Sequence, residues 1–151
     1  MKINKEGVDL ICKYESCVLH PYNATGKEPF MTIGYGHYGA DVPGIYNKAL
    51  EDHGEFTTSD ARKLLKDDLV RFEKFVENDC KHLKLNVNQF SALVSFTYNC
   101  GRGNLLKLIK NRDTKTIGDK MILYNKAGGV TLEGLKKRRT AEQKLYKKAV
   151  E

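Results

Sequence analysis

The sequence lacks any long apolar run, and this absence sets the first limits on what the chain can be. No stretch approaches the ~20 apolar residues that a transmembrane helix needs. Residues 1–6 contain neither an apolar core nor the small-residue cleavage site of a secretory signal. We therefore expect synthesis in a cytoplasm without a standard signal peptide, and no stable insertion into a membrane.

Patterns typical of metal sites and of repeats are also missing. The cysteines form no CxxC pair, and the histidines show no zinc-finger spacing. Because thiols stay reduced in a cytoplasm, we expect free, mostly buried cysteines at positions 12, 17, 80 and 100. A chain of 151 residues without repeats or low-complexity linkers fits a single domain.

The charge is strongly positive and unevenly spread. The net charge is +7 and the pI is about 9.2, which favours an anionic partner such as nucleic acid, anionic lipid or a cell-wall polymer. Four basic residues, 136–139, cluster near the C-terminus, and we interpret them as a solvated helix face. No recognised nucleic-acid motif accompanies them, so we expect no nucleic-acid partner.

Hydrophobic periodicity and capping residues predict a mostly helical chain. A first helix over 4–16 has Asn4 as a plausible N-cap, and a long amphipathic helix opens at Thr57, with Asp60 placed for capping, and runs to about residue 78. A heavily apolar helix begins near Asn86, with Gln89 as its capping partner, and stops at Gly101 and Gly103. Shorter helices are expected around 105–110 and 117–124, followed by a Gly-Gly turn at 128–129 and a last helix over 132–148, with its inward side chains at 135, 145 and 146.

Residues 18–46 differ from the rest, because they contain most of the early glycines and prolines. The alternating segment 31–36 resembles a short strand, so we expect a small β-hairpin here. The prediction is an α+β protein, mostly α, with a small sheet near the N-terminus. Glu15 lies where the first helix gives way to this extended region. A carboxylate at such a boundary, backed by apolar neighbours, suits a general acid.

Three segments resemble one known family. Glu15, Tyr22 and the run Thr32-Ile33-Gly34-Tyr35-Gly36-His37 resemble the active-site signature of phage-type lysozymes, a family of glycoside hydrolases. Residues 89–101 are similar to the family's core helix, and residues 134–142 are similar to its final segment, where paired arginines and a glutamate recur.

The resemblance implies a two-lobe, lysozyme-like fold over residues 1–151. A small N-terminal β-hairpin lobe of about 13–60 would be joined by a long helix to a helical lobe formed by 1–12 and 61–151. It also implies a muramidase, an enzyme that cleaves the β-1,4 bond between N-acetylmuramic acid and N-acetylglucosamine in peptidoglycan. Such endolysins lyse the host cell of a phage, and the implied enzyme is a monomer that uses no metal or other cofactor.

The resemblance also implies catalytic roles, although the chain departs from the family pattern. Glu15 would be the general acid, and the Thr32 hydroxyl would hold the attacking water. The family has an aspartate nine residues after the glutamate, where this chain has Ala24. Glu28 is one candidate for the second carboxylate and Asp41 is another. A water held by Thr32 without a second carboxylate is the third possibility.

Further residues are expected to support binding or structure. Tyr38 and Tyr98 either stack on sugar rings or pack in the core. Asn99 either binds an N-acetyl group or caps a helix end. His37 is interpreted mainly as structural, and the resemblance implies that Arg138 or Arg139 hydrogen-bonds Glu15.

Ala24 also motivates an alternative from another class. A lysozyme-like module that had lost catalysis would still hold glycan strands without cutting them. The leading hypothesis remains an enzyme, and nucleic-acid binding through the basic cluster is the third.

Overall fold

The computed structural model describes residues 1–151, which form two compact units. One unit contains residues 15–68, and the other contains residues 1–14 and 69–151. Helix α3 (Thr58–Asp79) contributes to both. The expectation that the whole chain acts as one lysozyme-like domain stays a prediction.

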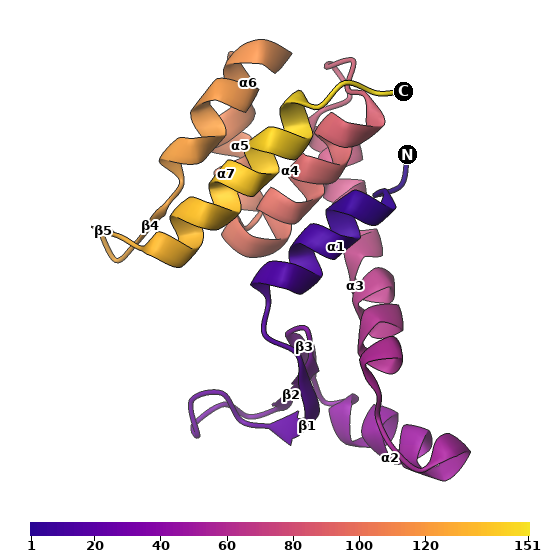
Figure 1. The fold of residues 1–151 in the computed structure, drawn as a ribbon. Helices are drawn as coiled ribbons and strands as arrows, with labels where there is room; N and C mark the ends of the chain where they lie inside the picture. Colours follow the sequence, from indigo (N-terminus) through magenta and orange to yellow (C-terminus); the bar gives the residue numbers. More distant parts are fainter. The chain divides into compact units, whose positions relative to one another are not determined.

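The unit of residues 15–68 is built on a three-stranded antiparallel sheet (Figure 1). Strands β1 (Val18–Tyr22), β2 (Met31–Gly34) and β3 (His37–Gly39) pair in the order β1-β2-β3, and helix α2 (Val42–His53) packs against all three. The predicted hairpin therefore has a third strand, and α2 was not expected. The tight turn from β2 to β3 uses Gly34 and Gly36, whose φ angles of +68° and +96° favour glycine.

Helix α3 starts as the sequence predicts. The Asp60 amide donates to Thr57 Oγ1 at 3.1 Å, and the Thr57 amide donates to Asp60 Oδ2 at 2.8 Å. This reciprocal pair satisfies two amides that a helix start leaves open. Hydrogen bonds from Thr57 and the contact with His53 lower the pKa of Asp60.

The second unit is helical and surrounds one buried helix. Helix α4 (Val87–Cys100) packs against α1 (Lys5–Tyr14), α5 (Arg102–Ile109) and α7 (Glu133–Lys147), as Figure 1 shows. Every residue from 90 to 97 is buried. The remaining elements are α6 (Thr114–Lys120), the 3₁₀ turn η1 (Met121–Leu123) and the two-residue strands β4 (Lys126–Ala127) and β5 (Val130–Thr131).

Local capping confirms two further predicted helix starts. Asn4 Oδ1 accepts from the Gly7 amide at 2.9 Å at the start of α1. Asn86 and Gln89 form a capping box at the start of α4, and Gly101, with φ of +86°, ends that helix. Gly103 lies inside α5 and does not end α4.

Several expectations about burial need correction. Arg138 and Arg139 are 2% and 0% exposed, so the interpretation of 136–139 as a solvated face is wrong for these two residues. Among the cysteines, Cys80 is buried and Cys17 is exposed, so "mostly buried" is also wrong. The inward side chains predicted for α7 are buried at 145 and 146 but only half-buried at 135. None of the helices combines the length and the apolar composition that a membrane span requires.

Candidate active site

A hollow of about 460 Å³ opens beside the three-stranded sheet. Its lining comes from the sheet and from the loop between β1 and β2, and consists of Tyr22, Ala24, Glu28, Thr32 and Tyr38. Four of these five residues were singled out from the sequence as catalytic, binding or signature positions. Ala24 is the fifth, and it occupies the position where the family carries an aspartate.

Sheet register explains why these side chains meet. Thr32 lies in the central strand, opposite Tyr22 on β1 and opposite Tyr38 on β3. Residues directly opposite in antiparallel strands present their side chains on the same face. Thr32 is 7% exposed, whereas Tyr38 is 44% exposed and packs edge-on against Phe30 at a centroid distance of 5.7 Å. Tyr38 is therefore an accessible aromatic face and not a core residue.

Glu28 reaches this hollow from the β1–β2 loop. The loop covers residues 23–30, and within it Glu28 is half-buried while residues 24–27 are exposed. The side-chain amide of Asn23 hydrogen-bonds the backbone of Glu28 at both its carbonyl and its N–H. The loop thus holds Glu28 at the same hollow as Thr32.

Glu15 follows the last residue of α1 and belongs to the same unit as Thr32. Its side chain is half-buried, and it is not among the residues that line the hollow. Its role as a general acid stays a prediction.

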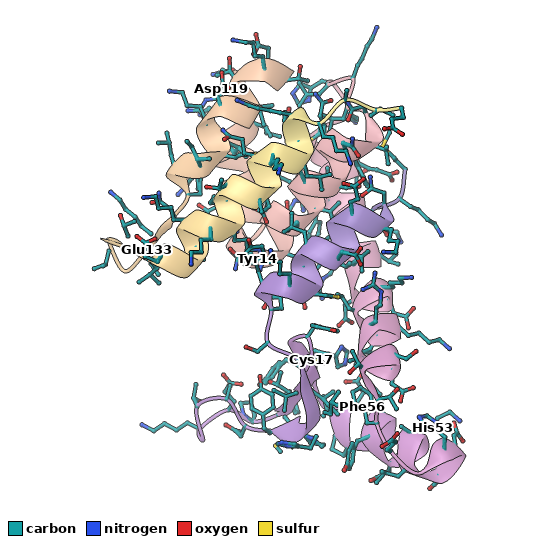
Figure 2. The ribbon with its side chains drawn as sticks, viewed as in Figure 1. Tyr14, Cys17, His53, Phe56, Asp119 and Glu133 are labelled. Atoms are coloured by element: carbon teal, nitrogen blue, oxygen red, sulfur yellow. The ribbon has the colours of Figure 1, made fainter.

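His37 and Asp41 lie at a different hollow, of about 540 Å³, beside α2 and the start of α3. His37 Nδ1 lies 2.8 Å from Asp68 Oδ2, and His37 Nε2 lies 2.9 Å from Asp41 Oδ1. Burial lowers the pKa of His37, but the two carboxylates outweigh it, so the pKa is raised. His53 and Phe56 line this hollow as well, and Figure 2 labels them. Glu28, and not Asp41, therefore shares a hollow with Thr32.

The other predicted residues lie in the helical unit. Tyr98 is half-buried and packs edge-on against Phe72, with ring centroids 5.1 Å apart. Asn99 is exposed, and its Oδ1 accepts a hydrogen bond from Arg139 Nη2. Asn99, near the end of α4, is thus held in place by an arginine of α7.

A buried charge network explains the burial of the two arginines. Glu142 is 0% exposed, with one oxygen 3.2 Å from Arg138 Nε and the other 2.9 Å from Arg139 Nε. Ser95 Oγ donates to Glu142 Oε2 at 2.5 Å. Burial raises the pKa of Glu142, against the opposing effect of the two guanidinium groups. Glu142 follows Arg139 and Arg138 by three and four residues on α7, the spacings at which side chains on one helix can pair.

Sequence comparison relates the chain to phage proteins. The family model described as "Phage lysozyme" matches residues 12–142. The endolysin of Bacillus phage PZA is 37% identical over 97% of this chain, and the endolysin of Lactococcus phage c2 is 33% identical over 99% of it. The chain spans only 55% and 62% of the lengths of these two relatives.

Structure comparison gives the same relationship. The endolysin from Escherichia coli O157:H7 phage FAHEc1 superposes with a TM-score of 0.74 at 29% identity, covering 99% of this chain and 96% of that chain. The muramidase domain of SpmX from Asticaccaulis excentricus gives a TM-score of 0.76 at 27% identity, covering 98% and 99%. The mostly helical α+β fold with its N-terminal sheet is thus a phage lysozyme fold, and the chain belongs to the phage lysozyme family.

Proposed function

We propose that this chain is a peptidoglycan muramidase. It would hydrolyse the β-1,4 bond between N-acetylmuramic acid and N-acetylglucosamine as the lytic part of a phage or prophage endolysin. Family membership supports the class of enzyme. The observation that carries the proposal to this chain is the single hollow in which Thr32, the carboxylate of Glu28 and two tyrosines gather.

In the proposed mechanism, one carboxyl group acts as general acid and a second acts as general base. Glu15 protonates the glycosidic oxygen as the bond breaks. The Thr32 hydroxyl holds a water molecule, and Glu28 accepts a proton from this water as the water attacks the anomeric carbon. Such a reaction inverts the anomeric centre, which requires about 6.5–9.5 Å between the two carboxyl groups.

Asp41 is the weaker candidate for the base. One of its oxygens already lies 2.9 Å from His37 Nε2, in the hollow that contains neither Thr32 nor Glu28. Because Asp41 does not line the hollow that contains Thr32, it is less well placed than Glu28 to accept a proton from a water held there. We therefore assign the role to Glu28.

Substrate binding would use aromatic faces and charge. The exposed ring of Tyr38 offers an apolar face to a sugar ring. A binding role for Tyr98 and Asn99 stays a prediction. The net charge of +7 favours attraction to the anionic cell wall. In this proposal the monomer needs no cofactor, is made in the host cytoplasm and acts on the wall after release.

A catalytically impaired glycan-binding module is the second candidate, and Ala24 is the observation that favours it. If the family's aspartate were indispensable, the chain would bind peptidoglycan without cutting it. Such a module would sediment with insoluble peptidoglycan and release no new reducing ends.

Digestion of purified peptidoglycan separates the two candidates. The wild type, Glu15→Gln and the surface control Glu51→Gln would be compared, with folding checked by circular dichroism. The proposal predicts that the wild type and Glu51→Gln release fragments ending in N-acetylmuramic acid, and that a folded Glu15→Gln releases none. Binding without release by the wild type would contradict it. Detection of the first-formed anomer by NMR tests inversion separately.

A further inference from the structure

Asn23 closes the loop that carries Glu28. Its Nδ2 donates to the carbonyl oxygen of Glu28 at 2.7 Å, and its Oδ1 accepts from the amide of Glu28 at 3.3 Å. The two contacts fix the orientation of the Asn23 amide, because one end must donate and the other must accept. A single side chain thus satisfies both backbone groups of Glu28.

This contact closes the loop that follows β1. Asn23 directly follows Tyr22, which pairs with Thr32 across β1 and β2. By engaging the backbone of Glu28, the Asn23 amide joins the two ends of the segment that places Glu28 at the hollow. Residues 24–27, between Asn23 and Glu28, form an exposed segment that we call the loop cap.

The loop cap has no carboxylate at its start, at position 24, but is followed directly by the carboxylate of Glu28. Ala24 is exposed at the start of the loop cap, and its methyl group can move no proton. Glu28 is half-buried directly after the loop cap and lines the hollow with Thr32. Inside the loop cap, the only other side-chain hydrogen bond runs from the Lys27 amide to Thr25 Oγ1 at 3.2 Å, and it does not involve Glu28.

We propose that Asn23 is a positioning residue that holds the carboxylate of Glu28 at the Thr32 hollow, four residues beyond the family's aspartate position. This inference rests on the proposed function, because it assumes that Glu28 is the second catalytic carboxylate. Asn23 itself touches the backbone of Glu28 and takes no part in proton transfer.

The expected effect lies in turnover and not in binding. A displacement of about 1 Å in a catalytic group can cost on the order of a hundredfold in rate. Asn23→Ala removes both hydrogen bonds, so kcat should fall about tenfold to a hundredfold while KM stays within about twofold. Asn23→Asp keeps an acceptor for the Glu28 amide but loses the donor to its carbonyl, so its loss should be intermediate.

The matched control is Thr25→Ala. It removes the other hydrogen bond of the same loop cap and leaves the Asn23–Glu28 contacts intact, so kcat should stay within about twofold of the wild type. Each variant would be assayed on soluble glycan fragments of peptidoglycan, and urea unfolding would show whether the fold is retained. If Asn23→Ala does not fold, the comparison of Asn23→Asp with Thr25→Ala takes its place.

A double-mutant cycle separates positioning from a general structural effect. If Asn23 acts through Glu28, then Asn23→Ala should cost no further activity in a Glu28→Gln background. An additive loss would overturn the inference. Wild-type kcat in Asn23→Ala, measured beside an impaired Glu28→Gln, would also overturn the inference. If Asn23→Ala does not fold, wild-type kcat in Asn23→Asp would have the same meaning. Either result would leave the proposed function standing. Wild-type activity in Glu28→Gln would instead refute the assigned base and the inference together.

Discussion

Replacing Glu142 by glutamine should destabilise the protein strongly, although the change replaces only one carboxylate oxygen by an amide nitrogen. Glu142 and Arg139 are both 0% exposed, and their ion pair at 2.9 Å lies in the helical unit. Glutamine keeps the shape and one carbonyl oxygen, but it carries no charge. Arg139 would then keep its contacts with Asn99, Cys100 and the ring of Phe96, none of which is a carboxylate.

The magnitude follows from the burial of the pair. Breaking a buried ion pair by removing one partner costs about 3–5 kcal/mol, because a charge remains without compensation. We expect a value near the lower end, about 3 kcal/mol, since the glutamine oxygen still accepts one hydrogen bond. For a protein of this size, 1 kcal/mol shifts Tm by about 2–4 °C, so Tm should fall by about 6–12 °C.

Urea unfolding followed by circular dichroism measures this loss directly. Glu51→Gln is the matched control, because Glu51 is exposed on α2 and should change stability by less than about 0.5 kcal/mol. A loss below about 1 kcal/mol for Glu142→Gln, at an unchanged urea dependence, would refute the reasoning that the buried charge must be compensated.

Three further predictions concern pH, capping and thiol reactivity. Because its contacts with Asp41 and Asp68 raise the pKa of His37 in the folded state, its stabilising contribution is fully present below the unfolded value of about 6.5 and is lost as pH rises through the folded pKa. In urea titrations, the wild type's advantage over His37→Gln should therefore shrink from about pH 6 to pH 9, and an advantage that grew with pH would contradict this. Asn86→Ala removes the α4 capping box and should cost about 1 kcal/mol in the same assay, so an unchanged midpoint would count against the cap. Iodoacetamide should label the exposed Cys17 in the native protein but not Cys80, whose pKa burial raises to about 12, and peptide mapping that found equal rates would contradict the buried position.

Helix starts could be predicted from the sequence because capping is local. Thr57 with Asp60, and Asn86 with Gln89, lie three residues apart, so the sequence contains all the information that their hydrogen bonds need. Helix α2 was not predicted, because its local sequence argues against a helix. Its first turn contains Pro43 and Gly44, which usually break helices, although proline is tolerated at a helix start.

Burial and partners depend on contacts between distant residues. The spacing of Glu142 from Arg138 and Arg139 permits an ion pair, but an exposed helix face would show the same spacing. Burial of the pair depends on distant partners such as Ser95, which is 47 residues away from Glu142. The family motif indicated Tyr22 and Thr32, but their meeting with Tyr38 depends on the register of a third strand. The choice between Glu28 and Asp41 could not be made from the sequence, because it depends on how the 23–30 loop closes.

The most direct test of the account is the turnover of Glu28→Gln on purified peptidoglycan, measured as new reducing ends beside the wild type and Glu51→Gln. The account predicts that a folded Glu28→Gln loses at least about a hundredfold in kcat, while Glu51→Gln matches the wild type. Wild-type turnover by Glu28→Gln would contradict the claim that Glu28 is the second catalytic carboxylate.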